Sequence, residues 1–373
     1  MNFALDDDHQ TLRRSARDFL EKEIDLAALL KPGATVADAG YRENWRKIVE
    51  LGWPGLVVPE EYGGLGLTCL DLAMIAGEMG RTLAPSPYFG TLAGTWAILK
   101  GGNASQKERI LPRVAADGLT LALAICDRDG SDEGPGSDAV ATETSGGYRL
   151  SGSKSFVVDG LSAGLIVVAA TLGDRRGLFL VDPAQPGVAV APLPWRDVTR
   201  EVCAISFDGA AAELLVGDDS SVWPWLRDRL LLLLAVESAA GLQTTIETTT
   251  EYAKERVAFG KPIGAYQAIK HQLADMFCAG ECANVAVLYA AWALSCEMPQ
   301  APLAVAMAKS QACDAFVAAT HQSIQIFGAI GFTWEMKNHL YFKRARANAE
   351  MFGAPAIQRA RVIGMLEAEA RAA

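Results

Sequence analysis

The hydrophobic positions follow a helical period in the first third of the chain. Near the N-terminus, apolar residues recur every three or four positions with charged residues between them: Leu12, Ala16, Phe19, Leu20 and Ile24. Residues 45–51 and 70–79 repeat this amphipathic pattern. Glycines and prolines interrupt it between residues 52 and 66, where they end helices rather than continue them. The pattern predicts amphipathic helices that pack on one apolar face and are joined by turns.

The pattern changes beyond about residue 119, where the apolar runs become short, β-branched and bounded by glycine. These runs are residues 121–126, 148–150, 156–158, 165–170, 178–181, 188–190 and 204–207. Several short strands with turn residues between them are typical of an all-β domain. We therefore expect a β-barrel or a β-sandwich in the middle of the chain.

The helical period returns at Trp225 and continues to the end. A broad apolar stripe runs through residues 269–294, interrupted by Gly280, as expected for a helix packed in a bundle. Because 373 residues are too many for one compact core, the order helical, β, helical predicts an α+β multidomain chain. We expect an N-terminal helical domain at residues 1–118, a middle β-domain at 119–220 and a C-terminal helical bundle at 221–373.

Composition limits the kinds of partner. A net charge of -10 and a pI near 5.1 argue against a nucleic-acid or anionic-membrane surface, because both require clustered lysine and arginine. The first 14 residues contain three aspartates and no apolar run, so no secretory signal is expected there. The richest apolar run, residues 230–236, is far shorter than a membrane span. These features predict a cytoplasmic protein whose partners are small molecules and other chains.

The seven cysteines give no sign of a metal centre. They are scattered along the chain without the paired close spacing of a zinc site. Cys278 and Cys282 are four residues apart and share a helix face, where we expect buried packing.

Three segments in the C-terminal third carry candidate chemistry. They begin with Glu255-Arg256-Val257-Ala258-Phe259-Gly260, with Gln325-Ile326-Phe327-Gly328-Ala329-Ile330-Gly331 and with Glu350-Met351-Phe352-Gly353-Ala354-Pro355. Their order and spacing resemble the signatures of the acyl-CoA dehydrogenase family. The resemblance implies a flavoprotein with an N-terminal α-helical domain, a middle β-barrel domain and a C-terminal four-helix bundle. It also implies FAD as the cofactor, an acyl-CoA substrate and electron-transfer flavoprotein as the electron acceptor.

The resemblance assigns six residues to FAD. In the family, the matching positions hold the adenine and pyrophosphate half of a neighbouring subunit's flavin. In this chain these positions are Arg256, Phe259, Gln267, Gln325, Gly328 and Gly331. Their chemistry agrees with this role, because guanidinium pairs with phosphate oxygens and glycine lets backbone approach them closely.

The residues expected at the flavin ring follow the family pattern less well. After Gly152-Ser153-Lys154 the chain has Phe156, which can stack on the ring, and Val158, which replaces a hydroxyl residue and offers no side-chain hydrogen bond. The preceding segment, residues 126–132, departs from the family's pattern. Gly136-Ser137-Asp138 offers a second alignment for the same contacts, and the two alignments stay open.

Phe352 occupies the position at which most relatives carry the catalytic glutamate. It follows Phe327 by 25 residues, which is the family's spacing. Removal of the substrate α-proton requires a base within hydrogen-bond reach, and an aromatic hydrocarbon accepts no proton. The resemblance therefore describes a member of the family that lacks its usual base.

The resemblance implies a second place for a base, because some branches of the family carry the carboxylate on the first helix of the C-terminal domain. Counting back from Glu255 leads to Leu230, which is not acidic, and two helical turns later to Glu237. A glutamate in so apolar a run would be desolvated, which suits a catalytic base. The alternative is a structural ion pair between Glu237 and an arginine.

Three hypotheses of function follow. In the first, the chain is an FAD-dependent dehydrogenase that forms trans-2-enoyl-CoA with Glu237 as a displaced base. In the second, it is the base-less supporting subunit of a heteromeric dehydrogenase, and it resembles the bacterial branch associated with lipid or steroid degradation. In the third, it is a flavin oxygenase on the same fold. Each implies a homo- or hetero-oligomer, either a dimer or a tetramer.

Overall fold

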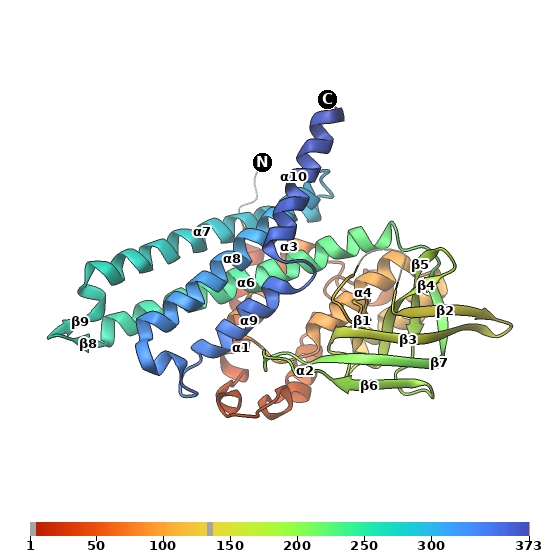
Figure 1. The fold of residues 1–373 in the computed structure, drawn as a ribbon, viewed down its shortest axis with the longest axis horizontal. Helices are drawn as coiled ribbons and strands as arrows, with labels where there is room; N and C mark the ends of the chain where they lie inside the picture. The colour runs from red at the N-terminus through yellow and green to blue at the C-terminus, as the bar shows by residue number, and fades with distance from the viewer. Residues whose placement is uncertain (1–4, 133–136, 373) are drawn as a thin grey trace.

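The structure places a helical body beside a β-sheet domain (Figure 1). It is a computed structural model that describes residues 5–132 and 137–372. Helices α1 to α5 come first, strands β1 to β7 follow, and helices α6 to α10 complete the chain. The predicted order helical, β, helical is therefore confirmed. Secondary structure changes type between Asp117 and Leu121 and again between Val216 and Val222. The division into domains at residues 118 and 220 stays a prediction.

Side chains cap the starts of three of the five N-terminal helices, α1, α3 and α5. The five helices are α1 (Asp7–Glu23), α2 (Tyr41–Glu50), α3 (Cys69–Thr82), α4 (Tyr88–Gly101) and α5 (Ala104–Asp117). At the start of α3, Thr68 and Asp71 form a reciprocal capping box, and Asn103 and Gln106 do the same for α5. Such caps satisfy backbone N–H groups that have no partner within the helix. Short 3-10 turns, including Ala27–Leu30, connect these helices.

The β-domain is a sheet that closes on itself. Its strands are β1 (Leu121–Ala124), β2 (Ala139–Thr144), β3 (Gly147–Val158), β4 (Leu165–Leu172), β5 (Arg175–Val181), β6 (Val188–Pro192) and β7 (Val202–Val216). Strands β4, β2, β3, β7 and β5 pair in this order and β5 pairs again with β4, which gives a barrel-like ring. A register shift in β3 between Lys154 and Val157 leaves Phe156 with a positive φ of 54°. This irregularity turns Phe156 away from the regular alternation of the strand.

The C-terminal helices pack around α8. They are α6 (Val222–Glu255), α7 (Gln267–Ser295), α8 (Ala301–Phe327), α9 (Asn338–Glu350) and α10 (Pro355–Ala372). The small hairpin β8 (Val257–Ala258) and β9 (Lys261–Pro262) joins α6 to α7 at the end of the molecule opposite the sheet (Figure 1). Helix α6 thus connects the two ends of the molecule.

Two of these helices are long and apolar enough to cross a membrane by length and composition. The most apolar windows of α6 and α7 have mean hydropathies of 1.3 and 1.4, and 72% and 39% of them are buried. Buried core helices pass the same test, so it is weak evidence for a span. In α7, the outer face exposes Phe277 and Val285 together with Cys278 and Cys282. The expectation that these two cysteines are buried was wrong. The face of α7 that packs inward carries other residues, among them Met276 and Ala283.

Gly80 marks the point at which α3 crosses α6. A Cβ atom at this position would lie 2.6 Å from the Cα atom of Glu237 and 2.8 Å from its carbonyl oxygen. Backbone atoms of a buried helix yield little, so Gly80→Ala is expected to lower the free energy of unfolding by about 1–3 kcal/mol in urea denaturation. Gly364→Ala on α10, with open space around it, is the matched control and should be neutral or slightly stabilising. Equal stability of both variants would contradict the close crossing.

Candidate flavin and acyl-CoA site

The loop between α9 and α10 holds Phe352 in a constrained conformation. Its φ is 54°, in the left-handed region, and the next residue, Gly353, has a φ of 97°. The side chain of Gln358 donates to the carbonyl oxygens of Phe352 at 3.1 Å and of Gly353 at 3.3 Å. The Phe352 ring packs edge-on against Trp223, with 6.1 Å between ring centroids. The position predicted to lack a base is therefore filled by an aromatic side chain. Gln358 fixes its backbone, and Trp223 packs against its ring.

The side predicted to face the flavin ring presents an aromatic surface with few polar groups. Phe156 is 40% exposed and lies beside Trp195, with 6.4 Å between centroids. Val158 is buried in the core, so its side chain supplies packing and no hydrogen bond. The Trp195 indole N–H is buried without a hydrogen-bond partner in the described chain. An aromatic ring fits this surface, because the exposed Phe156 side chain offers a stacking face.

Lys154 joins the two segments that compete for the alignment before β3. It is fully buried, and its ammonium donates to Asp127 Oδ1 and Ser137 Oγ, both at 2.6 Å. The two candidate segments therefore meet at one lysine. Gly136, part of the second alignment, lies outside the described residues. Burial lowers the pKa of Lys154, and the contact with Asp127 opposes that shift.

The residues predicted to hold the pyrophosphate gather at the β8–β9 end. Arg256 follows the last residue of α6, Gln267 begins α7 and Gln325 lies in the last turn of α8. Phe259 sits at the tip of the hairpin with a φ of 52° and is 98% exposed. A groove of about 330 Å³ contains both Phe259 and Gln325. A fully exposed, conformationally strained phenylalanine is costly unless another molecule covers it.

The two glycines of this end allow close approach of backbone. Gly328 ends α8 with a φ of 69°, which favours glycine. At Gly331 a Cβ atom would lie 2.8 Å from the Cβ atom of Phe327 and 3.0 Å from a carbonyl oxygen of α8. The structure thus brings together the segments that the sequence assigned to the pyrophosphate, at the end of the molecule where the β8–β9 hairpin lies apart from the sheet domain (Figure 1).

Glu237 is held by two arginines. It is 8% exposed, and Arg200 Nη2 donates to its two carboxylate oxygens at 2.8 and 2.6 Å. Arg344 Nη1 lies 3.7 Å away, and Asn348 Nδ2 donates at 3.3 Å. The structural ion pair that sequence analysis left as the alternative is therefore present. Both carboxylate oxygens of Glu237 are thus engaged by charged donors, and a substrate proton could reach them only if these contacts open.

Arg344 and Asp197 extend this network. Arg344 Nε donates to Asp197 Oδ2 at 2.6 Å, and both side chains are buried. Burial works against the charge of each group, but their mutual attraction outweighs it. The pKa of Asp197 is therefore lowered and that of Arg344 is raised. The network of four charges is balanced, with two arginines and two carboxylates.

Comparison with known proteins identifies the family. The family model for the acyl-CoA dehydrogenase N-terminal domain matches residues 6–117, and that for the acyl-CoA dehydrogenase C-terminal domain matches residues 229–366. The acyl-CoA dehydrogenase IpdE2 of Mycobacterium tuberculosis is 31% identical over 351 residues, which cover 94% of each chain. The chain belongs to the acyl-CoA dehydrogenase family. IpdE2 of Mycolicibacterium smegmatis is 30% identical, covering 98% of this chain and 99% of its own.

Solved structures agree with this assignment. The ChsE4-ChsE5 complex from Mycobacterium tuberculosis is similar, with a TM-score of 0.87 and 26% identity over 98% of this chain and 99% of that chain. A steroid ACAD has a TM-score of 0.84 and 27% identity over the same shares of the two chains. Butyryl-CoA dehydrogenase from Megasphaera elsdenii shares the fold, with a TM-score of 0.87 over 98% of this chain and 100% of that chain. FAD is the cofactor of this family.

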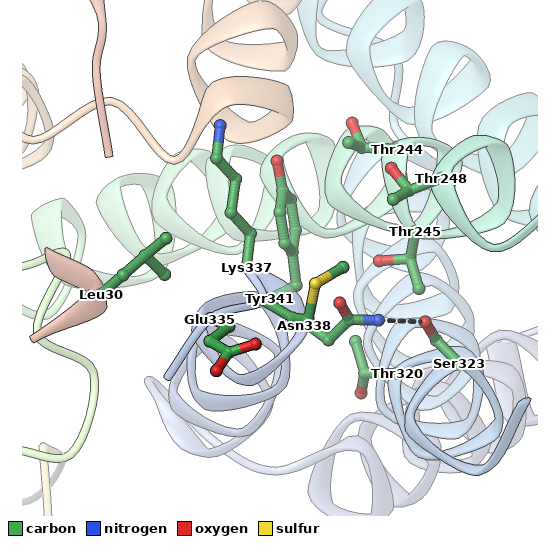
Figure 2. A pocket seen from close by; sticks show the side chains of 11 residues that line it. Leu30, Thr244, Thr245, Thr248, Thr320, Ser323, Glu335, Lys337, Asn338 and Tyr341 are labelled. Atoms are coloured by element: carbon green, nitrogen blue, oxygen red, sulfur yellow. Dashed lines mark hydrogen bonds between the residues drawn. The ribbon is translucent and has the colours of Figure 1, made fainter. Parts of the chain in front are cut away.

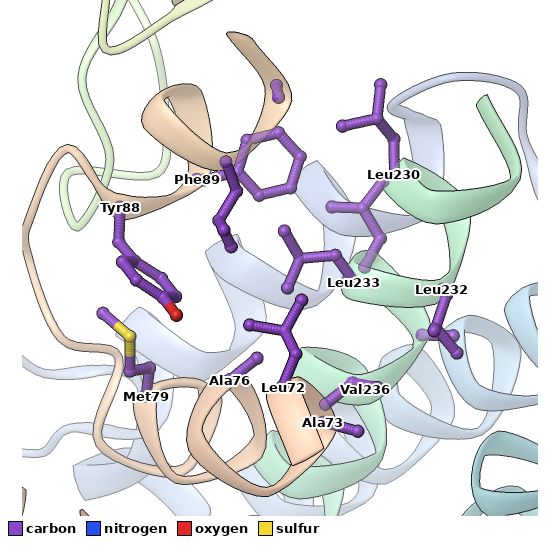
Figure 3. Close-up of a cluster of buried hydrophobic side chains, with 14 of the residues drawn as sticks. Leu72, Ala73, Ala76, Met79, Tyr88, Phe89, Leu230, Leu232, Leu233 and Val236 are labelled. Atoms are coloured by element: carbon purple, nitrogen blue, oxygen red, sulfur yellow. The ribbon is translucent and has the colours of Figure 1, made fainter. Parts of the chain in front are cut away.

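The region around Leu230 is a packed apolar core in this acyl-CoA dehydrogenase. Leu230 is fully buried, and Figure 3 shows it on α6 near Leu233 and Phe89. The side chains that fill the space between α3, α4 and α6 are Leu72, Ala73, Ala76, Met79, Tyr88, Phe89, Leu230, Leu232, Leu233 and Val236. The helix position at which some relatives place a carboxylate therefore supplies packing here.

Asp159 is a buried carboxyl that sequence analysis missed. It directly follows Val158, is 1% exposed, and accepts from Tyr41 Oη at 2.7 Å and from the Gly90 amide at 2.8 Å. Burial raises its pKa to about 7, against these hydrogen bonds and the nearby Arg200. One feature of the sequence could have indicated this buried carboxyl, namely an acidic residue directly after an apolar strand. Its partners come from other helices and cannot be read from its neighbours.

Asp159 is expected to make the fold less stable as the pH rises from 3.8 to about 7. Its folded pKa of about 7 lies above the ordinary value of 3.8, so the folded chain keeps a proton that the unfolded chain releases. The stabilisation is fully present below the ordinary pKa of 3.8. Between this pH and about 7, the free energy of unfolding falls by up to about 1.4 kcal/mol per pH unit. Asp159→Asn should flatten this part of a plot of unfolding free energy against pH. An unchanged slope would disprove the assignment.

A separate polar cavity of about 370 Å³ lies between α6, α8 and the start of α9. Figure 2 shows hydroxyl and amide side chains around it, with Asn338 donating to Ser323 Oγ at 2.8 Å. None of the residues assigned to FAD lines it. No group of three or more His, Cys, Asp or Glu fit to hold a metal occurs in residues 5–132 and 137–372.

Proposed function

We propose that this chain is the base-less supporting subunit of a heteromeric, FAD-dependent acyl-CoA dehydrogenase. One observation supports this above all: Phe352 fills the base position, while Glu237 is bound by Arg200 and Arg344. Dehydrogenation removes an α-proton and a β-hydride from the acyl-CoA and leaves trans-2-enoyl-CoA. When bound, FAD takes up the hydride, and the proton needs a base. In this proposal a sister chain supplies that base.

The chain's own contribution is to bind and orient. Arg256 is proposed to pair with the flavin pyrophosphate, Phe259 to cover the adenine side, and Gln325 and Gln267 to donate hydrogen bonds beside them. Gly328 and Gly331 leave room for the phosphates. Phe156, near the end of strand β3 in the sheet domain, is proposed to stack on a flavin ring, where Val158 adds shape alone. The β8–β9 hairpin lies apart from the sheet domain in Figure 1, and this supports a flavin that is shared between subunits.

Exposed apolar side chains on two outer helices support assembly with another chain. On α7, Phe277 is 52% exposed and Val285 is 53% exposed, and on α10, Ile363 is 56% exposed. Exposed apolar side chains on outer helices are suited to contact with another chain. The similar ChsE4-ChsE5 structure is a complex of two named chains. We therefore propose a hetero-oligomer, with a homo-oligomer, dimer or tetramer, as the alternative outcome of the test below.

The other parts of the proposal rest on the family. We propose electron-transfer flavoprotein as the acceptor and a bulky acyl-CoA, as in lipid or steroid degradation, as the substrate. The similarity to IpdE2 and to a steroid ACAD supports the substrate class. We also propose a cytoplasmic location, where thiols stay reduced, because all seven cysteines are free.

Co-expression tests the proposal. The chain is expressed alone and together with a sister dehydrogenase chain encoded near it, and bound FAD and acyl-CoA-dependent dye reduction are measured. Alone, the chain should hold little FAD and show no turnover, and both should appear on co-expression. A homo-oligomer with stoichiometric FAD and full turnover would overturn the supporting role and return the base to this chain.

Glu237→Gln distinguishes the two dehydrogenase hypotheses. The contact between Glu237 and Asn348 favours a displaced base at Glu237. Asn348 lies in the last turn of α9, which leads directly to Met351 and Phe352. If Glu237 is the base, the variant should lose turnover by at least about a hundredfold. If a sister chain holds the base, the folded heteromer should keep its turnover. Thr144→Ser on the distant sheet serves as an activity control.

A further inference from the structure

A second cavity lies where the N-terminal and C-terminal helices meet. It has a volume of about 330 Å³ and is bordered by the start of α3, the end of α4, the start of α6 and the end of α7. This is the lower end of the size range for small-molecule sites. It shares no lining residue with the groove at Phe259 or with the cavity in Figure 2.

Arg229 is a buried cation that opens on this cavity. It is 9% exposed, and its guanidinium carbon lies 3.4 Å from the centre of the Trp225 ring. Nη1 donates to the Trp225 carbonyl at 3.2 Å, and no carboxylate of the described residues lies within 4.0 Å of the guanidinium. The neighbouring carboxylate, Asp228, is taken by Arg361 at 2.5 Å. Burying a guanidinium without an anion is costly, so an anion at this place would stabilise it.

The other charges around the cavity leave it positive. Lys100 lies 5.5 Å from the same Trp225 ring, and the structure gives it no ion pair among the described residues. Glu297 is the lining's carboxylate and is exposed at the rim. The amide at the start of α3 adds little, because Leu70 N already donates to Thr68 and Ser295. Two cations therefore face one carboxylate.

The walls beyond the cations are apolar. They consist of side chains from four segments: Val57, Leu67, Trp96, Leu99 and Leu294. We propose that this cavity binds a small organic carboxylate with an apolar body, its carboxylate between Arg229 and Lys100 and its body against these walls. Arginine is suited to this role because its planar fork of donors pairs with both carboxylate oxygens. The site is independent of the flavin, the acyl-CoA and the subunit that supplies the base.

Calorimetric titration with hexanoate tests the proposal on the protein as isolated, alone or with its sister chain. Hexanoate should bind saturably, and hexan-1-ol, which has the same body and no charge, should not. Arg229→Gln should weaken binding at least about tenfold, as the loss of a charge-assisted pair does. Lys100→Gln, at the exposed rim, should weaken it severalfold, whereas Glu297→Gln should strengthen it because it removes the competing carboxylate.

The pattern across the three variants decides the outcome. Equal hexanoate affinity in the parent, Lys100→Gln and Glu297→Gln would overturn the proposal, as would absence of saturable binding in the parent. The two rim variants keep the test decisive if Arg229→Gln does not fold. Flavin content and dye reduction should be unchanged in Lys100→Gln, which separates this result from the test of the supporting-subunit role.

Discussion

Removing the Glu237 carboxylate is expected to destabilise the fold by about 3–5 kcal/mol in Glu237→Ala, because it leaves the buried Arg200 guanidinium without its partner. Arg200 is 7% exposed, and both of its contacts to carboxylate oxygens are lost in the variant. Arg344 keeps Asp197 and is affected less. The measurement is the free energy of unfolding from urea denaturation at constant pH.

A matched double variant separates the ion pair from packing. Replacing both partners in Arg200→Met with Glu237→Leu should cost far less than Glu237→Ala alone, since apolar residues of similar volume replace buried ion pairs with little loss. Arg46→Gln, which removes an exposed arginine paired with Glu43, should change stability by less than about 1 kcal/mol. If Glu237→Ala were as stable as the parent, the network would not have the role we assign to it.

Replacing the exposed Arg256 is expected to weaken FAD binding about tenfold to a hundredfold. Arg256 makes no ion pair within the described chain and has its side chain free to reach a phosphate at the β8–β9 end. A charge-assisted hydrogen bond of this kind contributes about 1.5–3 kcal/mol, which corresponds to this range of affinities. The measurement is a titration of the apo-heteromer, carrying Arg256→Gln, with FAD.

Two controls interpret the FAD titration. The unfolding free energy of Arg256→Gln should equal that of the parent, because the side chain is exposed and packs on nothing buried. Arg46→Gln on α2 should bind FAD normally. If Arg256→Gln retains the FAD affinity of the parent, Arg256 does not bind the pyrophosphate, and the role proposed for the β8–β9 end is wrong.

The sequence by itself determined the order of elements and the place of the missing base. The helical and alternating periods predict where helices give way to strands, because periodicity is a local property of the chain. The segments around Arg256, Gln325 and Phe352 identify the family from residue types at fixed spacing. Phe352 needed no structure for its interpretation, since its side chain lacks a proton acceptor wherever it lies.

Only the tertiary structure decided which charges are partnered. Glu237 meets Arg200 across 37 residues of sequence, and Asp159 meets Tyr41 across 118. Arg229 borders a cavity between four helices, and no described carboxylate forms an ion pair with it. Burial and pairing of a charged group depend on which distant segments pack around it, and the residues next to it in sequence do not record this. That is why the sequence offered Glu237 as a base but could not name Arg200 and Arg344 as its partners, and its catalytic role stays a prediction.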